Sequence, residues 1–251
     1  MPLNRMTFMN SFIDNVTMEE AVKEIERLIE SGIASYVVTI NVDVVIKIDE
    51  DEKLKEIVDN ANLVLADGKP LVWISKWLKK PVKEKVSGSD LVPKVCEAAV
   101  QKEFRLFIIG GKEGVAKSAQ RNLEKIYPGI KIVGTYSPPI GFENDDNECE
   151  KINEMIFNGR VDILLVCLGC PKQEKWVYSN YEKYNATVSI CGGATVDFLA
   201  GNVKRAPKWM SDHGFEWFYR FLQEPRRLFK RYFIDDVKIF IWALKYRCKI
   251  K

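Results

Sequence analysis

Polar and glycine-rich residues follow several short apolar segments of this 251-residue sequence, and they include the residue types that could do chemistry. Asn41 follows one segment, Asp67-Gly68 follows a second, and Gly192-Gly193 follows the last. A carboxylate such as that of Asp67 can serve as a general base, and glycines let backbone N–H groups approach a phosphate. The alternative for Asp67 is a helix cap, which is the more typical role of an Asp in front of a predicted helix.

A second glycine-rich turn, Gly110-Gly111-Lys112-Glu113-Gly114, lies between an apolar segment and a predicted helix, where backbone groups could bind a diphosphate. It lacks the G-x-G-x-x-G spacing of dinucleotide sites, and the next segment ends at Gly134-Thr135-Tyr136 without an acid for a ribose. These features favour a nucleotide, rather than NAD, as the ligand of this turn. A purely structural tight turn is the alternative.

The candidate metal and redox motifs have simpler interpretations. Cys167 and Cys170 have zinc or redox spacing, but His213 is the only histidine, so the pair is interpreted as part of a tight turn. Asp49-Glu50-Asp51 lies among charged, helix-like residues and is interpreted as a solvated face. We therefore expect no metal site. The six cysteines form no paired framework and are expected to be reduced.

Short apolar segments alternate with helical patterns, as is typical of a parallel sheet covered by helices on both faces. Before them, Thr17-Met18-Glu19-Glu20 has the spacing of a capping box and begins an amphipathic helix that ends near Gly32. We predict an α/β fold with a Rossmann-like, mostly parallel sheet, whose ligands gather at the carboxyl ends of the strands. The predicted strands are residues 36–40, 63–66, 106–109, 130–133, 163–166 and 188–191.

Charge is distributed unevenly along the chain. Residues 204–251 contain 13 Lys and Arg against 5 Asp and Glu, together with 12 of the aromatic residues, whereas the whole chain has a net charge of only +3. The total gives no reason to propose a nucleic-acid partner, but a basic and aromatic segment suits phosphates or lipid headgroups. Its apolar residues recur at helical spacing. We predict a catalytic core over 1–203 and a helical, membrane-associating appendage over 204–251.

No apolar run reaches the ~18 residues of a membrane-spanning helix, and the first residues lack the apolar core of a signal peptide. A cytoplasmic location is therefore expected.

Several longer strings resemble the WecG/TagA/CpsF family of bacterial glycosyltransferases, in order, from about residue 10 to residue 235. The strings are Thr39-Ile40-Asn41, Ala66-Asp67-Gly68, Val86-Ser87-Gly88-Ser89-Asp90, Gly169-Cys170-Pro171-Lys172-Gln173-Glu174, Gly192-Gly193-Ala194 with Asp197, and Glu216-Trp217-Phe218-Tyr219-Arg220.

The resemblance implies an inverting enzyme that moves N-acetylmannosamine from a UDP-sugar donor to N-acetylglucosamine on undecaprenyl diphosphate, in the synthesis of wall teichoic acid or another cell-surface polysaccharide. It implies neither metal nor cofactor, and a peripheral position on the inner face of the cell membrane. Another UDP-hexose such as glucose is the main alternative. A non-catalytic membrane scaffold and a nucleic-acid-binding protein are less favoured, and a homo-oligomer is possible.

The same resemblance implies roles for individual residues. Asp67 corresponds to the proposed base, Thr39 and Gln173 to catalytic pocket residues, and Arg220 and Arg227 to arginines of the appendage that reach the active site. Lys85 stands where the family usually has Arg, and Thr195-Val196 stands in place of an aromatic residue. The further substrate-binding candidates are Asn41, Lys85, Ser89, Asp90, Gly110, Gly111, Gly192, Gly193, Asp197, Lys230 and Arg231.

Overall fold

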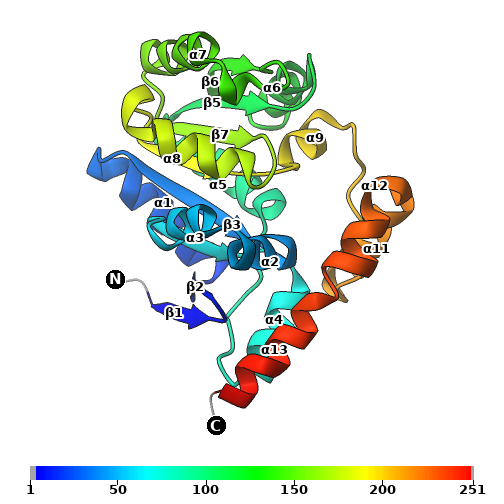
Figure 1. The fold of residues 1–251 in the computed structure, drawn as a ribbon. Coiled ribbons are helices and arrows are strands. Elements are labelled where there is room, and N and C mark those ends of the chain that lie inside the picture. The colour runs from blue at the N-terminus through cyan, green and yellow to red at the C-terminus, as the bar shows by residue number, and fades with distance from the viewer. Residues whose placement is uncertain (1–3, 250–251) are drawn as a thin grey trace.

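Six parallel strands form the central sheet, in the order β4-β3-β8-β7-β5-β6 (Figure 1). The computed structural model describes residues 4–249, so residues 1–3 and 250–251, at the ends of the two predicted domains, lie outside the described residues. Every predicted strand is confirmed, and so is the α/β class. The strands are β3 (Ser35–Ile40), β4 (Leu63–Ala66), β5 (Arg105–Gly110), β6 (Lys131–Tyr136), β7 (Ile163–Cys167) and β8 (Val188–Cys191).

Helices cover both faces of the sheet and create two apolar cores. Side chains of β3 alternate between them, with Val38 and Ile40 in the first core and Val37 in the second. The first core includes α2 (Val42–Glu50), α3 (Glu52–Asp59), α4 (Lys69–Trp77), α7 (Asp146–Gly159) and α8 (Lys172–Tyr184). The second includes α1 (Met18–Ser31), α5 (Gly88–Lys102), α6 (Val115–Ile126) and α9 (Thr195–Ala200).

Helix α1 begins and ends as the sequence predicts. The Thr17 hydroxyl accepts a hydrogen bond from the Glu20 N–H, and the Glu20 carboxylate accepts one from the Thr17 N–H. Gly32 ends the helix in the left-handed conformation at φ 67°, where a side chain would be strained. The capping box therefore sets the first helix of the fold.

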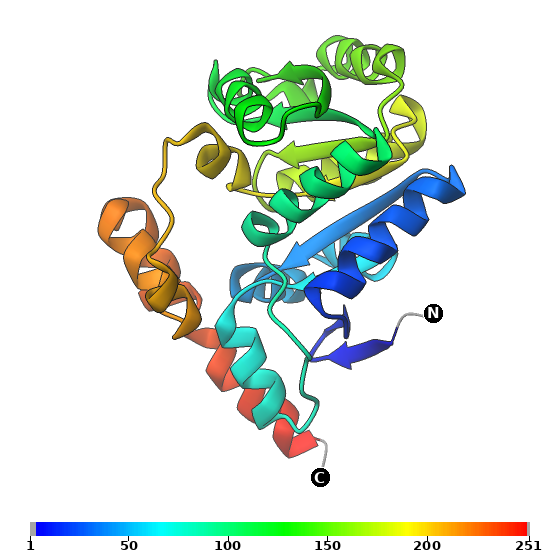
Figure 2. The same cartoon turned by 180° about the vertical axis from the view of Figure 1, so that it is seen from behind.

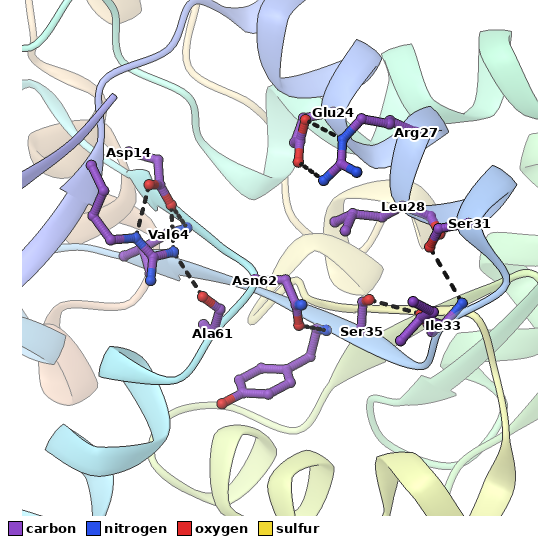
Figure 3. A network of polar contacts seen from close by, with 12 residues as sticks. Asp14, Glu24, Arg27, Leu28, Ser31, Ile33, Ser35, Ala61, Asn62 and Val64 are labelled. Atoms are coloured by element: carbon purple, nitrogen blue, oxygen red, sulfur yellow. Dashed lines mark hydrogen bonds and ion pairs between the residues drawn. The ribbon is translucent and has the colours of Figure 1, made fainter. Parts of the chain in front are cut away.

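A small hairpin that no sequence pattern predicted, β1 (Arg5–Phe8) and β2 (Ser11–Asp14), lies beside β4. The buried Asp14 carboxylate pairs with Arg5 at 2.8 Å and accepts the Val64 N–H at 2.7 Å, while Arg5 also donates to the Ala61 carbonyl (Figure 3). Each strand is only four residues long, too short for an alternating pattern to stand out. A long-range polar network holds this hairpin in place.

The neighbouring strands β3 and β8 mark the point where the chain changes direction across the sheet. Helix α2 follows β3 and packs in the first core, whereas α9 follows β8 and packs in the second. The two helices therefore leave the sheet on opposite faces. Such a switch point opens a crevice outside the carboxyl ends of the strands, which is the usual ligand site of this architecture.

Beyond Pro207, the described part of the chain contains helices and no strand, as predicted. We call residues 204–249 the tail and residues 4–203 the body. Helix α13 packs against α2 and buries Ile239 and Ala243, and Figures 1 and 2 show the tail running along one side of the body. The tail helices are α10 (Lys208–Asp212), α11 (Glu216–Gln223), α12 (Pro225–Lys230), a π-helical turn (Arg231–Asp235) and α13 (Lys238–Lys249).

Within residues 4–249, no helix is both long enough and apolar enough to cross a membrane.

Candidate active site

A cavity of about 840 Å³ lies at the carboxyl ends of β3, β4 and β8, with the tail forming its other wall. The body contributes the strand ends and the start of α8, and the tail contributes residues from α10 to α13. Most of the candidate site residues meet here although they are far apart in the sequence. Those lining the cavity are Thr39, Asn41, Asp67, Lys85, Ser89, Gln173, Gly192, Gly193, Arg220, Arg227 and Arg231.

Five candidates do not line it: Asp90, Asp197, Gly110, Gly111 and Lys230. The glycines are needed for packing, because a side chain on Gly110 would clash with the Cys167 carbonyl group and one on Gly111 would meet Val115. These contacts give the Gly110-Gly111 turn a structural role, and phosphate binding by the two glycines stays a prediction.

Asp67 directly follows β4, and its N–H donates to the Ile40 carbonyl at 2.7 Å, which fixes the backbone at the end of β3. The helix-cap interpretation is wrong, because the N-cap of α4 is Gly68 and no side chain caps that helix. Among residues 4–249, no hydrogen bond to the Asp67 carboxylate is found. Burial raises the pKa of Asp67 to about 6, against the attraction of Lys85. Asp67 is therefore an unbonded carboxylate of increased basicity on the cavity wall.

Lys85 is the cation beside Asp67, and its ammonium group also forms ion pairs with two other carboxylates. Its Nζ lies 2.7 Å from an Asp90 oxygen and 3.6 Å from Glu216 of α11. Asp90 also accepts the Ser87 hydroxyl at 2.6 Å and forms an ion pair with Arg205. Burial works against ionisation of Asp90, but the hydrogen bonds from Lys85, Ser87 and Arg205 hold its pKa below the usual range. Asp90, which does not line the cavity, thus fixes the position of the Lys85 ammonium group.

Thr39, at the end of β3, and Gln173, in the first turn of α8, fix the backbone around the crevice. The Thr39 hydroxyl donates to the Cys191 carbonyl at 3.2 Å. The buried Gln173 amide accepts the Gly193 N–H at 3.0 Å and donates to Glu174 at 2.7 Å. Both ends of the Gln173 amide are therefore engaged, and the residue joins α8 to the turn after β8.

Asn41 connects the body to the tail. Its side-chain oxygen caps α2 by accepting the Val44 N–H at 3.2 Å, and it also accepts from the Arg231 guanidinium at 3.3 Å. Arg231 further lies 3.8 Å from Asp43 and 3.9 Å from Asp236. Burial raises the pKa of Asp236 to about 6, against the attraction of Arg231. Together these groups hold the π-helical turn of the tail over the start of α2.

The three tail arginines of the cavity differ in their partners. Arg227 is paired with Glu224, and Arg231 faces the carboxylates of α2 and the tail. Arg220 forms no ion pair with any described residue; its buried Nε lacks a partner, and its guanidinium lies 5.4 Å from the Phe198 ring centroid. Arg220 is thus the cation most available for an anionic ligand.

Seven charged residues that line the cavity are not among the predicted site residues: Asp43, Lys47, Lys69, Glu174, Glu216, Asp235 and Asp236. Glu216 belongs to a string that carries the family resemblance, which was the only available signal. Asp43 follows the first apolar segment of the sheet, but its place in the site, like that of Asp236, depends on the position of the tail against α2. The ion pair of Asp43 with Arg231, like that of Arg205 with Asp90, crosses a long stretch of sequence. Asp236 pairs with Arg231 within the tail.

The arrangement suits proton removal beside a developing negative charge. A carboxylate without a hydrogen-bond partner can accept a proton from a hydroxyl group, and an arginine without a carboxylate partner can stabilise a departing phosphate. Within the described residues, no group of three or more His, Cys, Asp or Glu is placed to hold a metal ion. The cysteines form no disulfide there.

Comparisons with known proteins agree with this chemistry. Residues 6–251 match the profile described as the glycosyl transferase WecG/TagA/CpsF family. The chain is 31% identical, over 199 residues, to the N-acetylglucosaminyldiphosphoundecaprenol N-acetyl-beta-D-mannosaminyltransferase of Bacillus subtilis (strain 168), covering 79% of this chain and 75% of the relative. It is 27% identical, over 241 residues, to the enzyme of the same name from Staphylococcus aureus (strain MW2), covering 95% and 91%.

Proposed function

This chain belongs to the WecG/TagA/CpsF family of glycosyltransferases, and from that premise we propose that it transfers N-acetylmannosamine from UDP to N-acetylglucosamine carried on undecaprenyl diphosphate. The family assignment confirms the resemblance seen in the sequence. The substrates are those named for the similar enzymes. The observation that carries the proposal is the pairing, in one cavity, of an unbonded carboxylate, Asp67, with an unpaired cation, Arg220.

Asp67 acts as the general base. It takes the proton of an acceptor hydroxyl while that oxygen attacks the anomeric carbon of the donor sugar. The bond from the anomeric carbon to the β-phosphate oxygen of UDP breaks in the same step, so the configuration at that carbon inverts. The raised pKa of Asp67 strengthens the carboxylate as a base while leaving it ionised at neutral pH.

Arg220 and Arg227 stabilise the negative charge that develops on the leaving UDP. Both line the cavity from the tail, across from the strand ends of the body. Cations positioned in advance in a partly dehydrated site stabilise such a charge more strongly than water does. The reaction then needs no bound metal, as the family resemblance implies.

The tail also brings the enzyme to its lipid-linked substrate. Phe218, Leu222, Phe229 and Phe233 are exposed apolar side chains on α11, α12 and the π-helical turn, in a segment with excess positive charge. Apolar and basic groups together favour an anionic membrane surface. We place the enzyme as a peripheral protein at the inner face of the cell membrane, where docking holds the arginines over the site.

The test is release of UDP from UDP-N-acetylmannosamine in the presence of a short-chain lipid-diphosphate-N-acetylglucosamine acceptor. We expect release that requires the acceptor, continues in the presence of a chelator, and collapses in Asp67→Asn. Release with UDP-glucose but not with UDP-N-acetylmannosamine would replace the donor. Absence of release with every UDP-sugar would contradict the proposed activity.

A further inference from the structure

Helix α4 of the body exposes two tryptophans on the face that points away from its core. Trp73 is 50% exposed and Trp77 39% exposed, whereas Leu71, Ile74 and Leu78 on the other side are buried. The exposed stripe of a helix on a globular protein is normally polar. Lys76 shares the stripe with the tryptophans at helical spacing and is exposed, and the exposed Lys79 and Lys80 follow the end of the helix. The outer face of α4 is therefore basic and aromatic.

Helix α13 of the tail lies beside α4 (Figures 1 and 2). Its side chains Phe240, Ile241 and Leu244 are 59%, 57% and 55% exposed. The Arg247 guanidinium lies 4.6 Å from the ring centroid of Trp77, which joins the two helices at their far ends. The exposed apolar groups of α4 and α13 thus lie on adjoining helices, and we call them together the α4–α13 face.

The charged residues in the two helices of this face are all positive, and Glu50 of α2 lies 3.8 Å from Lys238 at the edge of the face. Residues 69–80 contain four lysines and residues 237–249 contain four Lys and Arg, and neither segment contains an Asp or Glu. The whole chain has 35 acidic residues against 38 basic ones, so the exclusion of acids from both helices is a local feature. A face with exposed indoles, aliphatic groups and an excess of positive charge is complementary to an anionic bilayer surface.

The same face borders the catalytic cavity. Trp73 lines the cavity from α4, and Val237 and Phe240 line it from the start of the last tail helix. Each of these side chains is also exposed at the surface. An acceptor whose lipid chain remains in the bilayer could extend its diphosphate and sugar into the cavity along this border.

We propose that the α4–α13 face is the bilayer-docking surface, that Trp73 and Trp77 insert at the headgroup level, and that the lipid-linked acceptor enters the cavity between Trp73 and Phe240. This inference rests on the proposed function, and it extends membrane docking from the tail to the catalytic body. Tryptophan is suited to that depth because its ring is apolar and its N–H can still bond to water or headgroups.

Binding to vesicles of phosphatidylcholine with phosphatidylglycerol tests the surface. We expect the double variant Trp73→Ser/Trp77→Ser to bind at least about tenfold more weakly than the unmodified protein, because two interfacial rings are lost. The matched control is Ile126→Ser/Phe157→Ser, which removes two exposed apolar side chains from α6 and α7, at the opposite end of the molecule (Figure 1). The control should bind as the unmodified protein does.

The outcomes separate this inference from the proposed function. Equal binding by the tryptophan variant and the unmodified protein overturns the role of α4 and leaves docking by the tail intact. Failure of the unmodified protein to bind these vesicles overturns both forms of docking. Quenching of its tryptophan fluorescence by brominated lipids, reduced in the tryptophan variant, supports insertion of the two rings.

The activity on two different acceptors supplies a second test, because a folding defect would lower both activities equally. The tryptophan variant should lose more activity on a long-chain acceptor embedded in vesicles than on a water-soluble short-chain acceptor. Equal loss on the two acceptors would indicate damage to the site itself and would overturn acceptor entry at this face.

Discussion

The body and the tail are built in opposite ways, and the active site lies where they meet. Strands β3, β4, β7 and β8 are buried along their whole length, whereas α11 has no buried residue and α12 has only Leu228. The apolar groups of the tail pack largely on one another, as in the edge-on contacts of Phe221 and Trp217 with Phe233. The body therefore supplies the stability and the proposed base, while the weakly buried tail supplies the arginines.

The two parts are held together by residues of the site itself. Tail residues Arg205, Glu216 and Arg231 contact Asp90, Lys85 and the Asn41–Asp43 segment, all at or beside the cavity. A ligand that binds these polar groups must therefore change the contacts that hold the tail. We infer that tail position and substrate binding are energetically coupled.

Deleting residues 204–251 gives the strongest test of this division. We expect transfer to fall to background, by at least about a thousandfold, because every cavity arginine is lost. The body should still unfold cooperatively, since the tail buries few side chains against it, among them Ile239 and Ala243. Circular dichroism during thermal unfolding and UDP release measure the two effects. Near-normal activity of the truncated chain would contradict the assignment of the cations to the tail.

Within the body, Asp67→Asn should lower the activity and raise the stability of the protein. Loss of the base is expected to lower kcat by about 10²–10⁴-fold. Because the pKa of Asp67 is raised to about 6, the ionised carboxylate opposes folding above that pH and has no such effect below about pH 4. The variant should therefore gain about 1–3 kcal/mol in free energy of unfolding at pH 7.5, and little at pH 4. Denaturant unfolding at the two pH values checks the sign.

Within the tail, neighbouring arginines provide a matched comparison. Arg220 lines the cavity without an ion-pair partner in the described structure, whereas Arg226 is exposed and outside the cavity. We expect Arg220→Ala to lower kcat by about 10²–10³-fold on a short-chain acceptor, because the leaving phosphate loses its cation. Arg226→Ala should change kcat less than about twofold. Similar losses in both variants would mean that the tail contributes only general positive charge.

The body could be predicted from the sequence far more completely than the tail. The strands of the sheet are apolar runs, and the Thr17–Glu20 cap of α1 is a local signal, so neither depends on knowing the rest of the fold. The placement of the tail depends on ion pairs such as Arg205 with Asp90, which join residues 115 apart. No local pattern encodes such contacts.

The candidate site also depends on contacts that no local sequence pattern encodes. Gly110 is a phosphate-binding candidate in the sequence because a tight turn and a phosphate loop both need glycine at positive φ. In the structure it adopts φ 120° against the Cys167 carbonyl group and does not line the cavity. Asp67 alone looked like a helix cap. Its position beside Ile40 and Lys85 follows from the pairing of β3 with β4 and from the loop before α5, which a single motif does not reveal.

The smallest expected effect concerns the electrostatic influence of the tail on Asp67 of the body. Asp67 in the body faces Lys85 and Asp90, also of the body, and Glu216 and Arg220 of the tail. The Glu216 carboxylate raises the pKa of Asp67 and lies 3.6 Å from Lys85, so it competes for the cation that favours ionised Asp67. Removing this charge should therefore lower the pKa of Asp67.

In Glu216→Gln, the acidic limb of the pH profile of kcat/KM should move from near pH 6 to lower pH, by a few tenths of a unit. Asp235→Asn is the matched control, because Asp235 also lines the cavity from the tail but is not among the charges that shift Asp67. Its acidic limb should stay in place whatever its effect on rate. A shift toward higher pH in Glu216→Gln would show that Glu216 acts mainly by holding Lys85 near Asp67, and the tail would then strengthen the proposed base through position rather than charge.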